Sequence, residues 1–364
     1  MKQTVFNAQH RALGAKMEPF AGYEMPVIYE GIIAEHNNVR SNVGVFDVSH
    51  MGEFTVKGIN AAAFLQRITT NDIASLHDGK VLYTCLPNGN GGVVDDMLVY
   101  RIAADNYLVV PNAANIEKDW NWFVRQNEVF NAELKNISDE ISQLAIQGPN
   151  ALKVAQKLTD THILDMEYYT FKHLTFAGIP DIILSTTGYT GAGGCEIYFK
   201  NENGAHIWNA VFEAGAEYGI RPAGLGARDT LRLEMGFCLY GHELNDNTST
   251  IEAGLNFITK FVDGNDFIDR PLYEQQKAHG VSKKLIGFEM ADRGIPRAEY
   301  SVTDANGNIT GSVCSGSQSP STGKAIGTAY VKPEYAKAGT EIYIDVRGRL
   351  LRALVVRMPF YAAP

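Results

Sequence analysis

Two neighbouring aspartates, Asp95 and Asp96, lie in a predicted strand over residues 93–103 that follows a tight glycine turn at residues 88–92. Successive strand residues point to opposite faces of a sheet, so the two carboxylates cannot both face one site. Burial raises the pKa of a carboxyl and costs stability unless the charge is paired, which favours a functional role for Asp96 on its apolar and aromatic face. The competing interpretation is that Asp96 caps a nearby backbone turn. Its neighbours on that face are Val94, Leu98, Tyr100 and Ile102.

A second chemically suggestive segment is the glycine-dense loop over residues 186–196, which enters a strand at residues 197–199. Glycines let a backbone approach a ligand closely, while Tyr189 offers an aromatic face and Glu196 offers a carboxylate acceptor. The competing interpretation is an ordinary hairpin in which Glu196 is solvated. The pattern alone favours that hairpin.

A third segment, residues 221–229, opens a helix that continues through Met235 and places Arg228 in the first turn. A guanidinium at this position would suit an anionic ligand through a pair of hydrogen bonds to its carboxylate. A salt bridge with Asp229 or Glu234 is the alternative.

Several better-known signatures are incomplete in this chain. The glycines of residues 224–229 lack the last glycine of a dinucleotide-binding motif, and residues 311–317 diverge from a phosphate-binding loop where its lysine should stand. Residues 321–324 match the pattern S-x-x-K without its companion motifs and are expected to form a loop. The pair His242-Glu243 begins like a zinc helix but has no second histidine at the required spacing, so no metal is expected.

The elements that must position these residues are separate helices among antiparallel strands, which predicts an α+β fold. From residue 285 onward the pattern changes to short β runs with turn signals and no convincing helix, so an all-β domain of barrel or sandwich type is expected there. Helices are predicted over 60–68, 115–123, 204–218 and 271–279, and strands over 52–57, 81–86, 93–103, 107–110, 144–147, 173–176, 181–185 and 197–199.

Length and composition limit the classes of function. At 364 residues the chain predicts two to three domains, and its net charge of -9 disfavours binding to nucleic acid or to an anionic membrane through bulk positive charge. Four cysteines without a C-x-x-C pair suggest neither a disulfide framework nor a zinc ribbon. The start of the chain has no apolar signal stretch, and no run of about 18 apolar residues occurs, so a cytoplasmic protein is expected.

Five motifs, in order over nearly the whole chain, resemble the glycine cleavage T-protein family, the aminomethyltransferases. Each is modest alone, but five in register at one chain length make a specific match. The resemblance implies a three-domain cloverleaf, with a C-terminal β-barrel, around a central cavity for tetrahydrofolate. The motifs are FDVSHMGE at 46–53, GGVVDD at 91–96, GYTG at 188–191, RPAGLGARD at 221–229 and MPFY at 358–361.

The implied domain boundaries divide the chain unevenly. Domain 1 is discontinuous, comprises residues 1–50 and 140–275, and is expected to bind folate. Domain 2 covers residues 51–139 and carries Asp96. Domain 3 covers residues 283–364 and is the expected barrel.

The resemblance also implies a reaction, in which a methylene passes from the aminomethyl-lipoyl arm of the H-protein to tetrahydrofolate and ammonia is released. The family's catalytic aspartate corresponds to Asp96, the residue that strand parity selects independently. Arg297 is a candidate contact to the carrier protein, and Glu299 stands where a glycine is frequent in the family. The positions that match folate contacts are Tyr189, Glu196 and Arg228, and those expected to line the same cavity are Met51, Tyr83, Tyr100 and Asn112.

Two other functions stay open at this point. One is a folate-dependent demethylase of the same superfamily, or the folate half of a sarcosine or dimethylglycine oxidase, although those oxidases carry a long flavin domain ahead of the folate part. The other is a non-catalytic folate-binding protein, whose signature the segment 236–243 resembles in part. The presence of Asp96 argues for catalysis.

Overall fold

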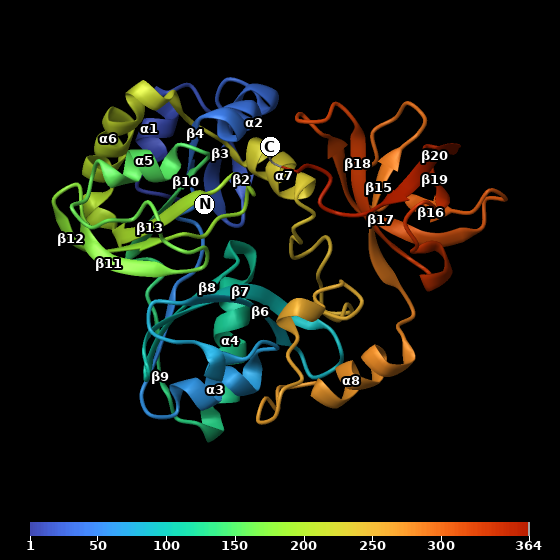
Figure 1. Cartoon of the computed structure of the whole chain (residues 1–364), viewed down its shortest axis with the longest axis horizontal. Helices are drawn as coiled ribbons and strands as arrows, with labels where there is room; N and C mark the ends of the chain where they lie inside the picture. The colour runs from blue at the N-terminus through green and yellow to red at the C-terminus, as the bar shows by residue number, and fades with distance from the viewer. Residues whose placement is uncertain (363–364) are drawn as a thin grey trace. The chain divides into compact units, whose positions relative to one another are not determined.

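The computed structural model describes residues 1–362, so the last two residues of the predicted third domain lie outside the described part. Figure 1 shows the helices and strands of the chain, coloured from the N-terminus to the C-terminus. The chain divides into two compact units. Unit 1 comprises residues 1–65, 73–83 and 97–231, and unit 2 comprises residues 66–72, 84–96 and the described residues from 232 onward.

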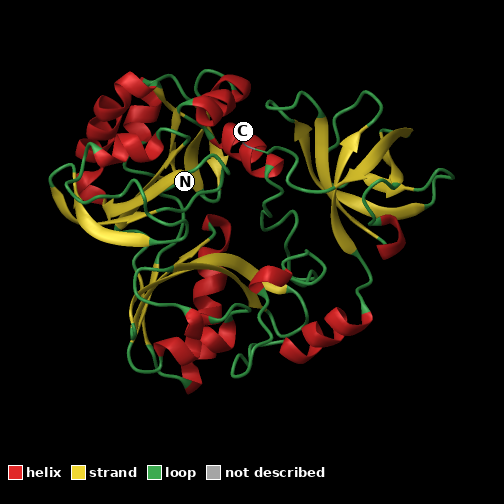
Figure 2. Cartoon of the chain, in the orientation of Figure 1, coloured by secondary structure: helices red, strands yellow, loops and turns green. Residues whose placement is uncertain are grey.

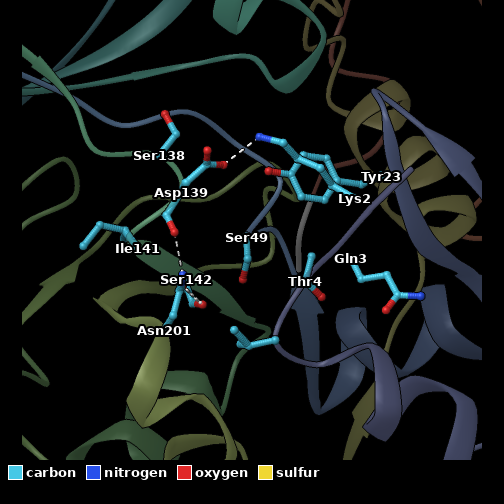
Figure 3. Close-up of a pocket in the computed structure, with 11 residues that line it drawn as sticks. Lys2, Gln3, Thr4, Tyr23, Ser49, Ser138, Asp139, Ile141, Ser142 and Asn201 are labelled. Carbon is cyan, nitrogen blue, oxygen red and sulfur yellow. Dashed lines mark hydrogen bonds and ion pairs between the residues drawn. The ribbon is translucent and has the colours of Figure 1, made fainter.

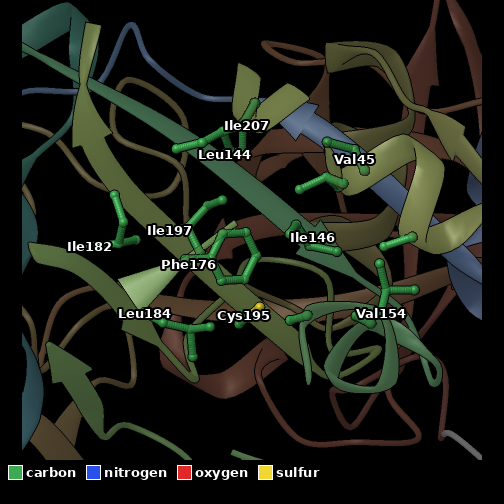
Figure 4. Close-up of a cluster of buried hydrophobic side chains, with 14 of the residues drawn as sticks. Val45, Leu144, Ile146, Val154, Phe176, Ile182, Leu184, Cys195, Ile197 and Ile207 are labelled. Carbon is green, nitrogen blue, oxygen red and sulfur yellow. The ribbon is translucent and has the colours of Figure 1, made fainter. Parts of the chain in front are cut away.

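Unit 1 contains a six-stranded sheet whose strands run in the order β11-β12-β13-β10-β4-β14. Its neighbours are antiparallel except β14, which joins β4 in parallel. Helices α5 (Ala151–Gln156) and α6 (Gly204–Gly215) pack their apolar residues against it, and Figure 4 shows part of this core. The strands are β4 (Val43–Asp47), β10 (Ile141–Gln147), β11 (Phe171–Phe176), β12 (Ile179–Ser185), β13 (Gly194–Lys200) and β14 (Ile220–Pro222).

A small sheet of order β1-β3-β2 comes from the first residues of the chain. Helix α1 (Asn7–Ala12) follows the first strand, and α2 (Ile32–Ser41) leads into β4. The strands are β1 (Lys2–Gln3), β2 (Lys16–Phe20) and β3 (Tyr23–Ile28).

The sheet that carries Asp96 has five strands in the order β6-β7-β8-β5-β9. Helices α3 (Ala61–Ile68) and α4 (Ile116–Gln126) contribute Phe64 and Phe123, whose rings lie 5.5 Å apart, and Phe54 of the sheet lies 5.5 Å from Phe123. The strands are β5 (Phe54–Lys57), β6 (Val81–Pro87), β7 (Val93–Ala103), β8 (Asn106–Pro111) and β9 (Glu133–Asn136).

The C-terminal part of unit 2 is a closed barrel of order β15-β18-β17-β16-β19-β20, in which β20 pairs with β15. Inward-facing residues such as Phe288, Val313 and Ile342 fill its interior. Figure 2 shows strands with little helix in this part of the chain, as the sequence predicts. The strands are β15 (Lys284–Met290), β16 (Ser301–Thr303), β17 (Ile309–Gln318), β18 (Ala325–Val331), β19 (Glu341–Val346) and β20 (Arg349–Val356).

Helices α7 (Leu225–Glu234) and α8 (Arg270–His279) complete the set of longer helices in the described residues. All five helices that the sequence predicts are present, and Gly219 and Gly280, which end two of them, adopt positive φ angles of 65° and 93°. The predicted α+β fold with antiparallel sheets and a C-terminal β-barrel is therefore confirmed.

Candidate active site

The turn that precedes β7 is fixed by hydrogen bonds within unit 2. The backbone N–H groups of Gly89 and Gly91, both at positive φ, donate to Oδ2 of Asp269 at 2.9 and 3.0 Å. Asn88 donates through Nδ2 to the carbonyl of Asp246 at 2.8 Å. The turn is thereby attached to segments far along the chain.

Gly92 is required by close packing at the end of that turn. A Cβ atom at this position would lie 1.9 Å from the carbonyl oxygen of Asp246, a distance that backbone atoms cannot accommodate. The next residue, Val93, donates its N–H to Asn245 at 3.2 Å and accepts from the Tyr240 hydroxyl at 3.2 Å. The first residue of β7 is therefore held in place, and with it the direction of Asp96 three residues later.

Both aspartates of β7 are buried, Asp95 at 0% exposure and Asp96 at 9%. Burial therefore does not separate them, and strand parity remains the argument that distinguishes them. On the Asp96 face, Leu98, Tyr100 and Ile102 pack in one cluster, as the alternation predicts. Burial raises the pKa of the Cys85 thiol, and the nearby Asp96 carboxylate raises it further.

Glu196 lies on β13 with 6% of its surface exposed, so the sequence-based interpretation of a solvated hairpin carboxylate is wrong. Burial raises the pKa of Glu196, while a hydrogen bond from Thr187, the charge of Arg228 and the amide of Gln143 oppose the rise. These three groups all stabilise the ionised carboxylate. The site therefore supplies donors to a buried acceptor.

A chain of hydroxyl groups leads to Glu196 through the interior of unit 1. The Gln143 amide donates from Nε2 to the Tyr198 hydroxyl at 3.0 Å, and that hydroxyl lies 2.7 Å from the hydroxyl of Tyr100. The Tyr100 hydroxyl lies 3.3 Å from Oγ1 of Thr187, which donates to Oε2 of Glu196. Each hydroxyl has one proton, so a chain that starts at the amide donates step by step toward Glu196.

Arg228 and Tyr189 form a stacked pair beside this carboxylate. The guanidinium carbon lies 4.7 Å from the centroid of the tyrosine ring, a favourable cation–π distance, and both residues are half-buried. Burial and the Arg228 charge lower the pKa of His50 to about 4. The charge of Arg228 thus acts on both Glu196 and His50.

The other predicted cavity residues occupy different environments. Met51 packs against the cluster that contains Tyr100 and also against the one that contains Ala227, next to Arg228, so the structure brings it to the same region. Tyr100 is fully buried, and its hydroxyl serves the hydrogen-bonded chain. Asn112 directly follows Pro111, whose carbonyl accepts from the Gly52 N–H at 3.2 Å, and Tyr83 is half-buried on β6.

Sequence reasoning gave no role to three residues of this cluster, Gln143, Thr187 and Tyr198. Gln143 and Tyr198 stand opposite each other where β10 pairs with β13. Tyr198 also shares a face of β13 with Glu196, two residues earlier. This alternation along the strand indicates that Tyr198 lies on the same face as Glu196. The strand that pairs with β13, and with it Gln143, could not be assigned from the sequence.

The incomplete motifs of the sequence have structural roles. Residues 321–324 form a loop, as expected, and Ser321 donates to Glu234 at 2.7 Å. Among residues 1–362, no group of three or more His, Cys, Asp or Glu side chains could hold a metal ion. The four cysteines are buried free thiols. In the same range, no helix is long and apolar enough to cross a bilayer.

Glu243, next to His242, forms a buried ion pair with Arg232 in unit 2. The distance is 3.0 Å, and the side chains are 0% and 1% exposed. Arg232 also donates to the Phe237 carbonyl at 3.0 Å and to Ser315 of β17 at 2.8 Å. Glu243 accepts from the hydroxyl of Thr328 on β18. The pair therefore links the end of α7 and the segment that follows it to β17 and β18 of the barrel.

The MPFY motif lies against the same segment. The N–H of Phe360 donates to the Glu234 carbonyl at 2.8 Å. A Cβ on Gly236 would approach the Met358 sulfur at 2.7 Å, and one on Gly287 would approach the same side chain at 2.6 Å. These contacts account for two glycines and for the motif as packing elements of unit 2.

A separate polar pocket of about 190 Å³ opens near the start of the chain (Figure 3). Lys2 crosses it to pair with Asp139 at 2.7 Å and lies 5.7 Å from the ring centroid of Tyr23. Ser142 donates to Asn201 at 2.7 Å. The charges of Lys2 and Asp139 at this pocket are therefore paired with each other.

Comparison with known proteins identifies the class first. The sequence matches the GCVT N-terminal domain family over residues 6–263 and the glycine cleavage T-protein C-terminal barrel domain family over residues 283–362. A curated aminomethyltransferase of Bacteroides fragilis is 60% identical over 360 residues, covering 99% of each chain. One of Flavobacterium psychrophilum is 53% identical over 361 residues, again covering 99% of each chain. The chain is thus a transferase enzyme.

A solved structure agrees with these relatives. The glycine cleavage system aminomethyltransferase T from Bartonella henselae is 28% identical, with a TM-score of 0.92 that covers 100% of this chain and 98% of that chain. The chain belongs to the glycine cleavage T-protein family of aminomethyltransferases, which confirms the resemblance drawn from the five sequence motifs.

Proposed function

We propose that this aminomethyltransferase takes the methylene group from the aminomethyl-lipoyl arm of an H-protein and passes it to tetrahydrofolate. Ammonia and dihydrolipoyl H-protein are the other products. The observation that carries the proposal is the buried Glu196 carboxylate, which is surrounded by donors and lies beside a guanidinium stacked on Tyr189. The family and its named relatives support the same reaction class.

The side chains of unit 1 fit a folate. A pterin ring presents adjacent N–H donors, and an ionised Glu196 would accept two of them as a bidentate acceptor. Arg228 would provide the local cation that an acidic protein needs for the carboxylates of the glutamyl tail. Tyr189 would provide an aromatic face, with Met51, Tyr83 and Asn112 lining the same space, while the fully buried Tyr100 would act through its hydroxyl in the chain that leads to Glu196.

Asp96 is the proposed catalytic carboxylate. Bound tetrahydrofolate supplies the nucleophilic nitrogen that accepts the methylene. Asp96 would orient that nitrogen and hold the proton that moves during transfer, a contribution of about 10²-fold or more for a well-placed acid or base. The fixed turn at residues 88–92 and the anchored Val93 support this role, because positioning requires a rigid mount.

Two further expectations go with this function. The three-domain division, with domain 2 carrying Asp96, stays a prediction. A cytoplasmic location is consistent with four buried thiols without disulfides, as is usual in a reducing compartment.

The direct test mixes the purified chain with aminomethylated lipoyl H-protein and tetrahydrofolate and measures ammonia release. The controls omit tetrahydrofolate or use H-protein without its lipoyl group, and both should reduce the rate to background. Tetrahydrofolate binding without ammonia release would instead favour the non-catalytic folate-binding alternative. Release of ammonia that does not depend on H-protein would contradict the proposed substrate.

A further inference from the structure

Glu53 is a buried carboxyl that the proposed mechanism does not use. It precedes β5, its side chain is 0% exposed, and neither carboxylate oxygen has a hydrogen-bond partner among the described residues. Burial alone raises the pKa of Glu53 well above its ordinary value. An isolated buried carboxylate ion is strongly unfavourable, so burial favours the protonated form of Glu53. A neutral carboxyl is then an O–H donor that needs an acceptor.

An acceptor with the complementary need belongs to Gln143, whose amide contacts Tyr198. Oε1 of Gln143 is buried and has no hydrogen-bond partner among the described residues, although Nε2 of the same amide donates to Tyr198. Glu53 lies near enough to Tyr198 for its charge to raise the pKa of that phenol. The Glu53 carboxyl, which lacks an acceptor, and Oε1 of Gln143, which lacks a donor, therefore both lie near Tyr198.

We propose that Glu53 is a positioning residue of the folate site, which donates its carboxyl O–H to Oε1 of Gln143 directly or through one water molecule. This contact fixes the amide with Nε2 toward Tyr198 and Glu196. The inference rests on the proposed role of Glu196 in holding folate, but the protonation of Glu53 can be measured without any substrate.

The orientation of the amide decides the direction of the whole hydrogen-bonded chain. With Nε2 toward Tyr198, that hydroxyl accepts from the amide and keeps its own proton for Tyr100, and the donors continue to Glu196. An ionised Glu53 would attract the amide N–H instead and turn Oε1 toward Tyr198. The Tyr198 proton would then point away from Tyr100, and Glu196 would lose part of its support.

His50 is the competing acceptor. Its Nδ1 atom is buried without a hydrogen-bond partner among the described residues, and it lies three residues before Glu53. The ring of His50 lies 5.4 Å from that of Phe20 and 6.5 Å from that of Tyr23. Glu53 also influences the pKa of Tyr23. Gln143 is favoured over His50 as the acceptor from Glu53, because this contact explains both the orientation of the Gln143 amide and the missing partner of its Oε1 atom.

The first test is infrared spectroscopy of the ligand-free protein at neutral pH. A wild-type minus Glu53→Gln difference spectrum should contain the C=O band of a protonated carboxyl. Gln143→Leu should shift that band toward the position of an unbonded carboxyl, and His50→Phe should leave it in place. No protonated band, or a shift in the His50 variant alone, would overturn the proposal.

The second test separates positioning from a general structural role by comparing two variants in calorimetric binding of tetrahydrofolate. Glu53→Gln keeps a neutral donor and should bind within about threefold of wild type, whereas Glu53→Leu removes the donor and should weaken binding by about tenfold. Circular dichroism must show both variants folded. Equal affinities of the two folded variants would contradict positioning through Gln143, whereas failure of the wild type to bind would contradict the folate proposal and leave the infrared result standing.

Discussion

The guanidinium of Arg228 stacks on the ring of Tyr189, with its carbon 4.7 Å from the ring centroid. Arg228 belongs to the first turn of α7, and Tyr189 belongs to the glycine-rich loop before β13. Two motifs that are separated in the sequence are therefore joined by one contact. The stack holds the cation in place without a ligand, which reduces the entropy cost of binding an anion.

Replacing Arg228 tests this preorganised cation. Arg228→Lys keeps the charge but loses the planar fork and should weaken tetrahydrofolate binding several-fold, while Arg228→Ala should weaken it by about tenfold or more. Isothermal titration calorimetry measures both affinities. Lys172→Ala, on an exposed side chain of β11, is a control that should bind as wild type. Unchanged binding in Arg228→Ala would remove Arg228 from the folate site.

Asp96→Asn tests the catalytic carboxylate. The variant should keep much of the folate affinity but transfer the methylene at least about tenfold more slowly, a loss of roughly 1.4 kcal/mol of transition-state stabilisation. Asp95→Asn is the matched control because it changes the opposite face of the same strand. Since both residues are buried, thermal unfolding must accompany the rates. If the two variants lost the same factor in kcat, strand parity would not identify the catalytic residue.

Asp269→Ala tests whether the turn before β7 positions Asp96. Its carboxylate accepts from Gly89 and Gly91, so its loss should loosen the turn and reduce kcat by about three- to tenfold through misalignment. Asp266→Ala, a nearby aspartate whose side chain is 83% exposed, should leave kcat unchanged. Steady-state ammonia release gives both values. Wild-type kcat in folded Asp269→Ala would show that the turn is not needed for alignment.

Arg297→Glu tests the predicted contact with the carrier protein. Arg297 is exposed, and its guanidinium lies 3.4 Å from the Gly316 carbonyl. Reversing a rim charge acts mainly on encounter, so the KM for loaded H-protein should rise about three- to tenfold at low salt, with less effect at high salt. Tetrahydrofolate affinity should stay the same.

The matched control for Arg297 is Arg349→Glu, an exposed arginine at the start of β20 in the same barrel. It should leave the KM for H-protein unchanged. A parallel loss of folate affinity in Arg297→Glu would move Arg297 from the carrier interface to the folate site. Equal KM values for the two variants would remove it from the interface.

Glu53→Gln should change how stability depends on pH. Because the pKa of Glu53 is raised in the folded state, the native protein binds more protons than the unfolded chain above the ordinary glutamate pKa. Its contribution to the free energy of unfolding therefore falls as pH rises, by up to about 1.4 kcal/mol per pH unit. Glu53→Gln lacks this loss and should be more stable than wild type at pH 7 but similar near pH 4.

Urea unfolding of both proteins at several pH values measures that difference. Other groups near Glu53 also titrate. Burial lowers the pKa of His50 to about 4, so the contribution of His50 to the free energy of unfolding rises with pH between pH 4 and the ordinary histidine pKa. Tyr23 and Tyr198 ionise only above pH 10. Subtracting the free energy of unfolding of the wild type from that of Glu53→Gln at each pH cancels these contributions. A difference that does not vary with pH would mean that Glu53 is not protonated in the folded state.

The predicted helices and strands were those with strong local signals. Helix α6 ends near Gly219, and α8 has proline in its first turn and ends before Gly280. Helix α2 was not predicted, because its buried face includes polar residues rather than an apolar stripe. One of them, Glu35, accepts N–H groups from Tyr29 at 2.7 Å and from Gly224 at 2.7 Å, and such partners cannot be read from a local pattern.

The same limit applies to the site. Asp96 stands out because a carboxylate is unusual on an apolar strand face, whereas Glu196 and Arg228 are assigned to the site mainly by the family resemblance. Gln143 and Tyr198 do not stand out, because their meaning depends on the pairing of β10 with β13. Glu53 lies within a motif that the sequence identified, but its burial became apparent only with the fold.

The ion pair between Arg232 and Glu243 has a consequence for how such sequences diverge. Removing one partner would leave a buried charge and cost about 3–5 kcal/mol, whereas replacing both by apolar residues of similar volume is often neutral or stabilising. A single substitution at either position is therefore strongly destabilising, whereas the double substitution changes the stability of the fold little. We expect the two positions to covary among descendants of a common ancestor, with Ser315 and Thr328 free to lose their hydroxyls only after both charges have gone.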